Sequence, residues 1–185
     1  VRRVPGKPWH GELLNYRSIL VTGEQGVGDE IMFSSCLPDL LALGAQCRMS
    51  CDDRLRPLLA RAFPSIQFID DPARADAEFT VSLGSLPLHF RHAVTNFPGT
   101  AYLAPDAERV RSWRARLDGL GDGMKIGIAW QGGLLRTGRA MRSVDLEMLL
   151  PLLRAPGVHG VSLQAGNVEE ELQALRRAHG VSVAH

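Results

Sequence analysis

The sequence has 185 residues, of which 45% are hydrophobic and 22% charged, a composition typical of one globular domain or slightly more. The formal net charge of +1 gives no electrostatic case for nucleic-acid binding, and no apolar run reaches the roughly 18 residues that a membrane span needs. We expect no signal peptide at the start of the chain. Because the sequence begins with Val1 rather than Met, we expect it to be a piece of a longer protein.

The cysteines are Cys36, Cys47 and Cys51, an odd number without regular spacing. This pattern favours free thiols in a reducing cytoplasm over a disulfide framework. Cys47 and Cys51 alone do not form a zinc site, which needs four ligands. We therefore expect a cytoplasmic protein without a metal.

The first part of the chain predicts strands that alternate with helices. Residues 1–15 form a basic lead-in, and a long apolar helical pattern that ends at Gly44 is interrupted by Pro38, which predicts a kink or a helix in two pieces. Strands are predicted in 17–23, 45–52, 65–70 and 77–87, the last with its tail over 82–87 as a loop, and a second helix in 53–63. Such alternation indicates βαβ units and a parallel sheet.

A second series of the same kind begins near Met124. An amphipathic helix over 108–120 precedes it, and the series continues with strands in 125–130, 158–164 and 181–184 and helices in 144–155 and 168–178. The remaining 60 or so residues are few for a complete doubly wound domain, because domains most often have roughly 100–150 residues. We therefore expect one Rossmann-like domain over 1–122 and the truncated start of another over 123–185.

A glycine loop, LVTGEQGVGDE, follows the first of these strands. Gly23 and Gly28 have the spacing of a phosphate-binding loop, but Asp29 and Glu30 stand where that loop has Lys and Ser or Thr. The dinucleotide fingerprint fails as well, at Ile31. On spacing alone, Asp29 is an N-cap of the next helix, or a proton acceptor at the carboxyl end of the strand, where open α/β sheets bind ligands.

A second glycine loop, WQGGLLRTGRAMRS, has the opposite charge. The backbone N–H groups of 130–133, three arginines and a helix start would suit a diphosphate. The arginines, which equally fit solvated loop charge, are Arg136, Arg139 and Arg142.

Two histidines and two tryptophans are weaker candidates. His89 and His92 stand three residues apart, but two histidines make no metal site, so we expect loop or surface positions. Trp9 and Trp113 are predicted to be packing anchors.

Several motifs together resemble the glycosyltransferase region of bacterial tetratricopeptide-repeat proteins. That family has a W-x-G step, an E-Q-G-x-G-D loop and a Pro nine residues after the Asp, and this chain has them in order. An S-L-P segment and a K-I-G-I-A-W-Q-G opening with a later R-S pair also match. The matching positions are Trp9, Gly11, Glu24, Gln25, Gly26, Gly28, Asp29, Pro38, Ser85, Leu86, Pro87, Arg142 and Ser143.

The resemblance implies an architecture and a reaction. The family is similar to the heptosyltransferases of glycosyltransferase family 9, which have two Rossmann-like domains of the GT-B type. It implies inverting transfer of a sugar from a nucleotide-diphosphate sugar to a hydroxyl, with the acceptor on the first domain and the donor on the second. The acceptor would be a protein, a lipid or a polysaccharide. No further cofactor and no metal are implied, and helical repeats are expected upstream.

The resemblance also implies roles for individual residues. Asp29 corresponds to the proposed catalytic base. Acceptor binding falls to Gln25, Gly26, Gly28 and Ser85, and donor diphosphate binding to Gln131, Gly132, Arg142, Ser143 and Gln164.

The second loop departs from the family pattern, which usually has W-x-G-N-P followed by a His and an Asp. This chain has Gly133, Leu134, Arg136 and Arg139 at those positions. A non-catalytic binding or scaffold module therefore stays open as the alternative, and we expect the fragment by itself to be inactive. A nucleotide-dependent oxidoreductase is disfavoured because neither loop completes the G-x-G-x-x-G pattern.

Overall fold

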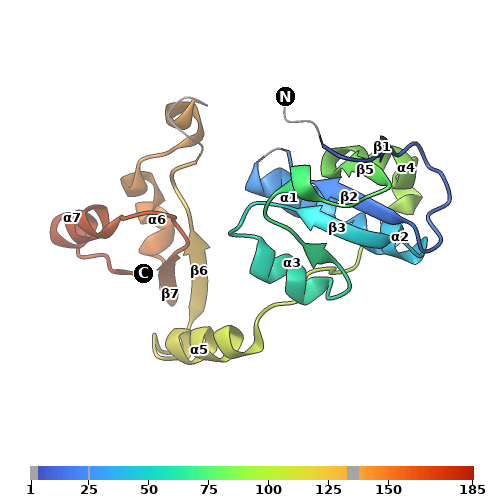
Figure 1. Ribbon diagram of the computed structural model, residues 1–185. Helices are drawn as coiled ribbons and strands as arrows, with labels where there is room; N and C mark the ends of the chain where they lie inside the picture. Colours follow the sequence, from blue (N-terminus) through green and yellow to red (C-terminus); the bar gives the residue numbers. More distant parts are fainter. Residues whose placement is uncertain (1–3, 25, 133–137) are drawn as a thin grey trace. The chain divides into compact units, whose positions relative to one another are not determined.

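The protein has an α/β fold with parallel strands, as the sequence predicts (Figure 1). A computed structural model describes residues 4–24, 26–132 and 138–185, without the side chains of 139 and 140. Within these ranges, no helix has the length and apolar character needed to cross a membrane. The chain divides into two compact units, Val1–Asp106 and Ala107–His185, each with its own sheet. The helix that precedes the predicted boundary at 122/123 thus groups with the second unit.

The first unit contains a five-stranded parallel sheet in the order β1-β5-β2-β3-β4. The central strand carries the consecutive residues Ile19, Leu20 and Val21, all fully buried, as expected for a parallel strand covered on both faces. The strands are β1 (Lys7–Pro8), β2 (Ser18–Thr22), β3 (Gln46–Ser50), β4 (Gln67–Phe68) and β5 (Phe79–Ser82).

Short helices connect these strands. The expected interruption at Pro38 is confirmed, because α1 ends at Ser34 and Pro38 lies in the first turn of α2, where a missing N–H costs least. Gly44 follows α2 with a positive φ of 75°, which suits a glycine after a helix end. The helices are α1 (Val27–Ser34), α2 (Leu37–Ala42), α3 (Arg56–Ala62) and α4 (Pro87–Phe90), with 3₁₀ turns η1 (Pro72–Arg74), η2 (Leu83–Ser85) and η3 (Val94–Asn96).

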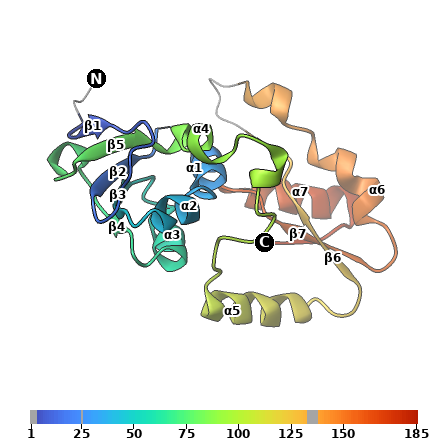
Figure 2. The same ribbon diagram turned by 90° about the vertical axis from the view of Figure 1, so that its right-hand side faces the viewer.

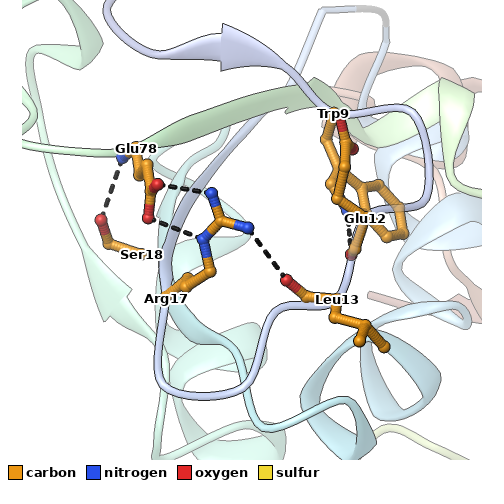
Figure 3. A network of polar contacts seen from close by, with 6 residues as sticks. All are labelled: Trp9, Glu12, Leu13, Arg17, Ser18 and Glu78. Carbon is orange, nitrogen blue, oxygen red and sulfur yellow. Dashed lines mark hydrogen bonds and ion pairs between the residues drawn. The ribbon is translucent and has the colours of Figure 1, made fainter.

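The lead-in forms part of the sheet, which the sequence pattern did not predict. Strand β1 pairs with β5, and the backbone N–H of Trp9 donates to the carbonyl of Thr80 over 2.9 Å. Trp9 is buried, which confirms it as a packing anchor, and its Nε1 donates to the Glu12 carbonyl (Figure 3). Arg17 and Glu78 form a paired hydrogen bond beside it, with Nε–Oε2 at 2.9 Å. The strand pairing and the bond between Trp9 and Thr80 fix the lead-in against β5.

The second unit has a three-stranded parallel sheet in the order β6-β7-β8 and a smaller core. Figure 2 labels two of these strands, β6 and β7. The helix expected over 144–155 consists of two short pieces, with Pro151 in the first turn of the second. Trp113 is not a buried anchor: its side chain is 47% exposed, with the Arg116 guanidinium over its ring. The elements are α5 (Ala107–Asp118), β6 (Met124–Ile128), η5 (Arg139–Arg142), η6 (Leu146–Leu149), α6 (Leu150–Leu153), β7 (Val158–Ser162), α7 (Glu169–His179) and β8 (Val183–Ala184).

Candidate functional site

The first glycine loop joins the carboxyl end of β2 to helix α1. Gly26, not Asp29, is the N-cap of this helix, so the N-cap interpretation of Asp29 is wrong. Asp29 lies in the first turn, and its Oδ2 accepts a hydrogen bond of 3.2 Å from the Gly26 N–H. A carboxylate in this position is stabilised by the free N–H groups and the dipole of the helix. Asp29 remains partly accessible, whereas Gln25 lies outside the described residues.

The neighbouring carboxylate, Glu30, is buried, which the sequence did not indicate. Its side chain is 5% exposed, and its Oε2 accepts a hydrogen bond of 2.9 Å from the Asp52 N–H, just after β3. The carboxylate packs over Gly23, where a Cβ would lie only 2.7 Å from Glu30 Cδ. Glu30 therefore ties the glycine loop to the end of the neighbouring strand, and Gly23 leaves the room for it.

A pocket of about 410 Å³ lies at the carboxyl ends of β1, β5 and β2. Ser85 lines it, and η2, which carries Ser85, contacts helix α1. Gly26, Gly28 and Asp29 are not among the lining residues. The lining residues are Val4, Pro8, Trp9, His10, Thr22, Thr80, Val81, Ser82, Ser85, Leu88 and His89.

His89, which lines this pocket, packs against Trp9 and has a lowered pKa. Its ring centroid lies 4.3 Å from that of Trp9. Burial lowers the pKa of His89, and the nearby imidazoles of His10 and His92 lower it further, against a smaller raising effect of Glu12. His89 and His92 were expected at loop or surface positions. His89 instead lies half-buried on α4.

The second glycine loop is held by a glutamine. Gln164 Oε1 accepts hydrogen bonds from the backbone N–H groups of Trp130 and Gln131, at 3.0 and 2.8 Å, and its Nε2 donates to the Gln131 carbonyl. The Gly132 N–H points to Ser143 Oγ at 3.3 Å. The structure thus brings together four of the residues expected at the donor diphosphate. It also shows that the N–H groups of 130–132, expected to face a ligand, are used within the protein.

Charges of both signs lie near this loop. Glu171 accepts hydrogen bonds from Trp130 Nε1 at 3.0 Å and from Gln131 Nε2 at 2.8 Å. Arg142 is exposed, and no described residue hydrogen-bonds to its guanidinium. The departures at Gly133, Leu134 and Arg136 fall outside the described residues, and the side chain of Arg139 is not described.

The three cysteines are not among the residues that line the pocket. All three cysteines are free. Burial raises the pKa of Cys47 to about 12, and burial together with the Glu30 carboxylate raises the pKa of Cys51 to about 11. In the part of the chain that the structure describes, no three His, Cys, Asp or Glu side chains are grouped so that they could hold a metal ion.

Comparisons with known proteins give one relative. The chain is 32% identical over 203 aligned positions to Protein FlbA of Caulobacter vibrioides (strain ATCC 19089 / CIP 103742 / CB 15). The match covers 98% of this chain but 34% of FlbA, so the chain spans about a third of that protein's length. No protein-family model and no solved structure matches the chain. Nearly the whole chain is therefore similar to one segment of FlbA, whose name describes no reaction.

Proposed function

We propose that the chain belongs to a glycosyltransferase region of the GT-B type, which transfers a sugar with inversion from a nucleotide-diphosphate sugar to an acceptor hydroxyl. The observation that carries the proposal is a repeated layout. Each of the two α/β units has a sheet of parallel strands, and in each a glycine loop directly follows a strand. The first loop carries a partly accessible carboxylate, and the second lies beside an exposed guanidinium. The resemblance to the tetratricopeptide-repeat glycosyltransferases and heptosyltransferases supplies the reaction.

In this proposal the first unit holds the acceptor, and Asp29 is the base. Asp29 Oδ2 is fixed by the Gly26 N–H, and no described residue hydrogen-bonds to Oδ1. Asp29 takes the proton of the acceptor hydroxyl as its oxygen bonds to the anomeric carbon, while the bond from that carbon to the nucleotide diphosphate breaks. A carboxylate is a weak base, so it orients the hydroxyl and accepts the proton late.

The second unit holds the donor. The departing diphosphate gains negative charge, and a guanidinium that already faces it stabilises the transition state. Arg142 is suited to this role, because its side chain is exposed and the start of the same loop, at Gln131 and Gly132, is hydrogen-bonded to Gln164 and Ser143.

One observation favours a second function, a non-catalytic binding or scaffold module. The N–H groups of Trp130, Gln131 and Gly132 already have acceptors within the protein, and the Glu171 carboxylate is hydrogen-bonded to the same loop. A diphosphate there would lack these three backbone donors and would face a like charge, which is unfavourable.

Nucleotide binding separates the two functions. UDP, GDP and ADP are titrated calorimetrically into the protein at its natural full length, into Arg142→Ala and into Arg177→Ala, which removes an exposed arginine from α7. The glycosyltransferase proposal predicts that at least one nucleotide binds and that Arg142→Ala weakens it about tenfold or more, the value of a charged hydrogen bond. Binding by none of them favours the scaffold, and equal losses in both variants contradict the role of Arg142.

A further inference from the structure

Among the described residues, the pocket at the carboxyl ends of β1, β5 and β2 is lined by hydroxyl and aliphatic side chains, by Trp9 and by the imidazoles of His10 and His89. Four of its described residues carry hydroxyls, and four more offer aliphatic carbon. Among the residues that the structure describes, no carboxylate, lysine or arginine lines it. Its volume of about 410 Å³ falls within the roughly 300–1,000 Å³ of small-molecule sites. The hydroxyl residues are Thr22, Thr80, Ser82 and Ser85, and the aliphatic ones are Val4, Pro8, Val81 and Leu88.

His89 adds a fixed hydrogen-bonding group to this wall. The His89 ring packs against Trp9. Gly11 is also close to the ring, and a Cβ at that glycine would be 3.6 Å from His89 Nδ1. No described residue hydrogen-bonds to either ring nitrogen of His89. An imidazole that is packed in place and lacks a protein partner leaves a hydrogen bond for a ligand to make.

The charge of His89 bears on the class of ligand. Burial and the two neighbouring imidazoles lower its pKa, and Glu12 opposes them only weakly, so the ring is neutral at neutral pH. The described lining has no lysine or arginine to compensate the desolvation of an anionic ligand, which favours ligands without a formal charge. Hydroxyl side chains beside aliphatic carbon match the two kinds of surface on a sugar ring.

We propose that this pocket binds a neutral, polyhydroxylated acceptor, with one ligand hydroxyl hydrogen-bonded to the imidazole of His89 and others to the hydroxyls of Thr80 and Ser85. This rests on the proposed function, and it names the substrate class of the first unit. It also makes His89 a binding residue in addition to Asp29. The acceptor is then an uncharged glycan or glycoside rather than a phosphorylated or carboxylated sugar.

Saturation-transfer NMR on the protein at its natural full length tests this. The probes are glucose, galactose, rhamnose and N-acetylglucosamine, each titrated beside glucose 6-phosphate and glucuronate as charged counterparts. We expect at least one neutral sugar to bind more tightly than both charged ones. Thr80→Val keeps the branched shape of the strand residue, and His89→Phe keeps the ring against Trp9. Each should weaken binding roughly three- to tenfold, the value of one neutral hydrogen bond.

His92→Phe is the matched control, because His92 is exposed and does not line the pocket; it should bind like the parent protein. Thermal unfolding of each variant confirms the fold, and if His89→Phe fails to fold, Thr80→Val decides. Tighter binding of the charged sugars, no binding of any neutral sugar, or unchanged binding by folded Thr80→Val overturns the inference. Nucleotide titration of the same samples separates the two proposals, because Arg142-dependent nucleotide binding without sugar binding overturns the pocket assignment alone.

Discussion

Gly23 and Gly28 lie five residues apart around the first glycine loop, but replacement by alanine should affect them in opposite directions. At Gly23 a Cβ would lie 2.7 Å from Glu30 Cδ, and closer still to Oε1, whereas at Gly28 a Cβ meets nothing within 4 Å. The backbone at Gly23 cannot easily move away, because its N–H donates to the Ser50 carbonyl over 2.8 Å. Gly23→Ala therefore has to displace the buried carboxylate of Glu30.

The magnitude follows from the contact that is lost. Displacing Glu30 breaks its 2.9 Å hydrogen bond from the Asp52 N–H. A hydrogen bond to a charged group contributes about 1.5–3 kcal/mol, so Gly23→Ala should lower the free energy of unfolding of the first unit by about 2 kcal/mol. Gly28 is inside helix α1, where alanine is favoured over glycine. Gly28→Ala should raise the same free energy by about 0.5–1 kcal/mol.

Hydrogen exchange of the β2 amides reports on this unit alone and gives both free energies. A double-mutant cycle with Glu30→Ala then isolates the cause. Because Glu30→Ala removes the atoms that the new methyl group would meet, Gly23→Ala should cost nearly nothing in that background, which gives a coupling of about 2 kcal/mol. Additive effects of the two substitutions, or a loss at Gly28 equal to that at Gly23, would refute the packing of Glu30 over Gly23.

Three further predictions concern other parts of the chain. Gln164→Leu leaves the N–H groups of Trp130 and Gln131 without their acceptor. Hydrogen exchange of the β6 amides should therefore show that the free energy of opening falls by about 2 kcal/mol. Unchanged exchange would contradict the role of Gln164 in holding these two residues. Because the pKa of Cys51 is about 11, its thiolate at pH 8 is scarce, and iodoacetamide should alkylate it at least about tenfold more slowly in the folded than in the urea-unfolded chain. Equal rates would show an exposed thiol. The pKa of His89 is lowered in the folded state, so the unfolded chain binds more protons and stability should fall as pH drops below the ordinary value of 6.5. In His89→Phe that fall should be shallower, and an identical pH profile of thermal unfolding would contradict the burial of this ring.

Most of the sheet could be predicted because its signals are local. The apolar strand β2, the interruption at Pro38 and the glycine after α2 each follow from a few neighbouring residues. Strand β1 could not be predicted in this way. It consists of Lys7 and Pro8, which show no apolar alternation, and its partner β5 lies about seventy residues away in the sequence. Trp9 was the one local sign that the lead-in packs against the core.

The candidate site could be predicted only in part, for the same reason. Gln164 and Ser143 were expected beside the second loop, and the structure places them there, but their bonds to backbone N–H groups depend on chain geometry. Glutamate is almost never fully buried without a partner, and the partner of Glu30 is a backbone N–H in another loop. The surroundings of His89 depend on β1 and therefore could not be seen in the residues around it.

The most direct test of the proposed transfer is the turnover of Asp29→Asn. The amide oxygen of asparagine can still accept the hydrogen bond from the Gly26 N–H, so the helix start is kept while the base is lost. Nucleoside diphosphate release is measured at natural full length on a panel of nucleotide sugars, with Asp76→Asn as the control because Asp76 is exposed and outside both loops. We predict that Asp29→Asn lowers the rate about 100-fold or more and that Asp76→Asn does not. Release by Asp29→Asn at the parent rate would contradict the role of Asp29 as the base.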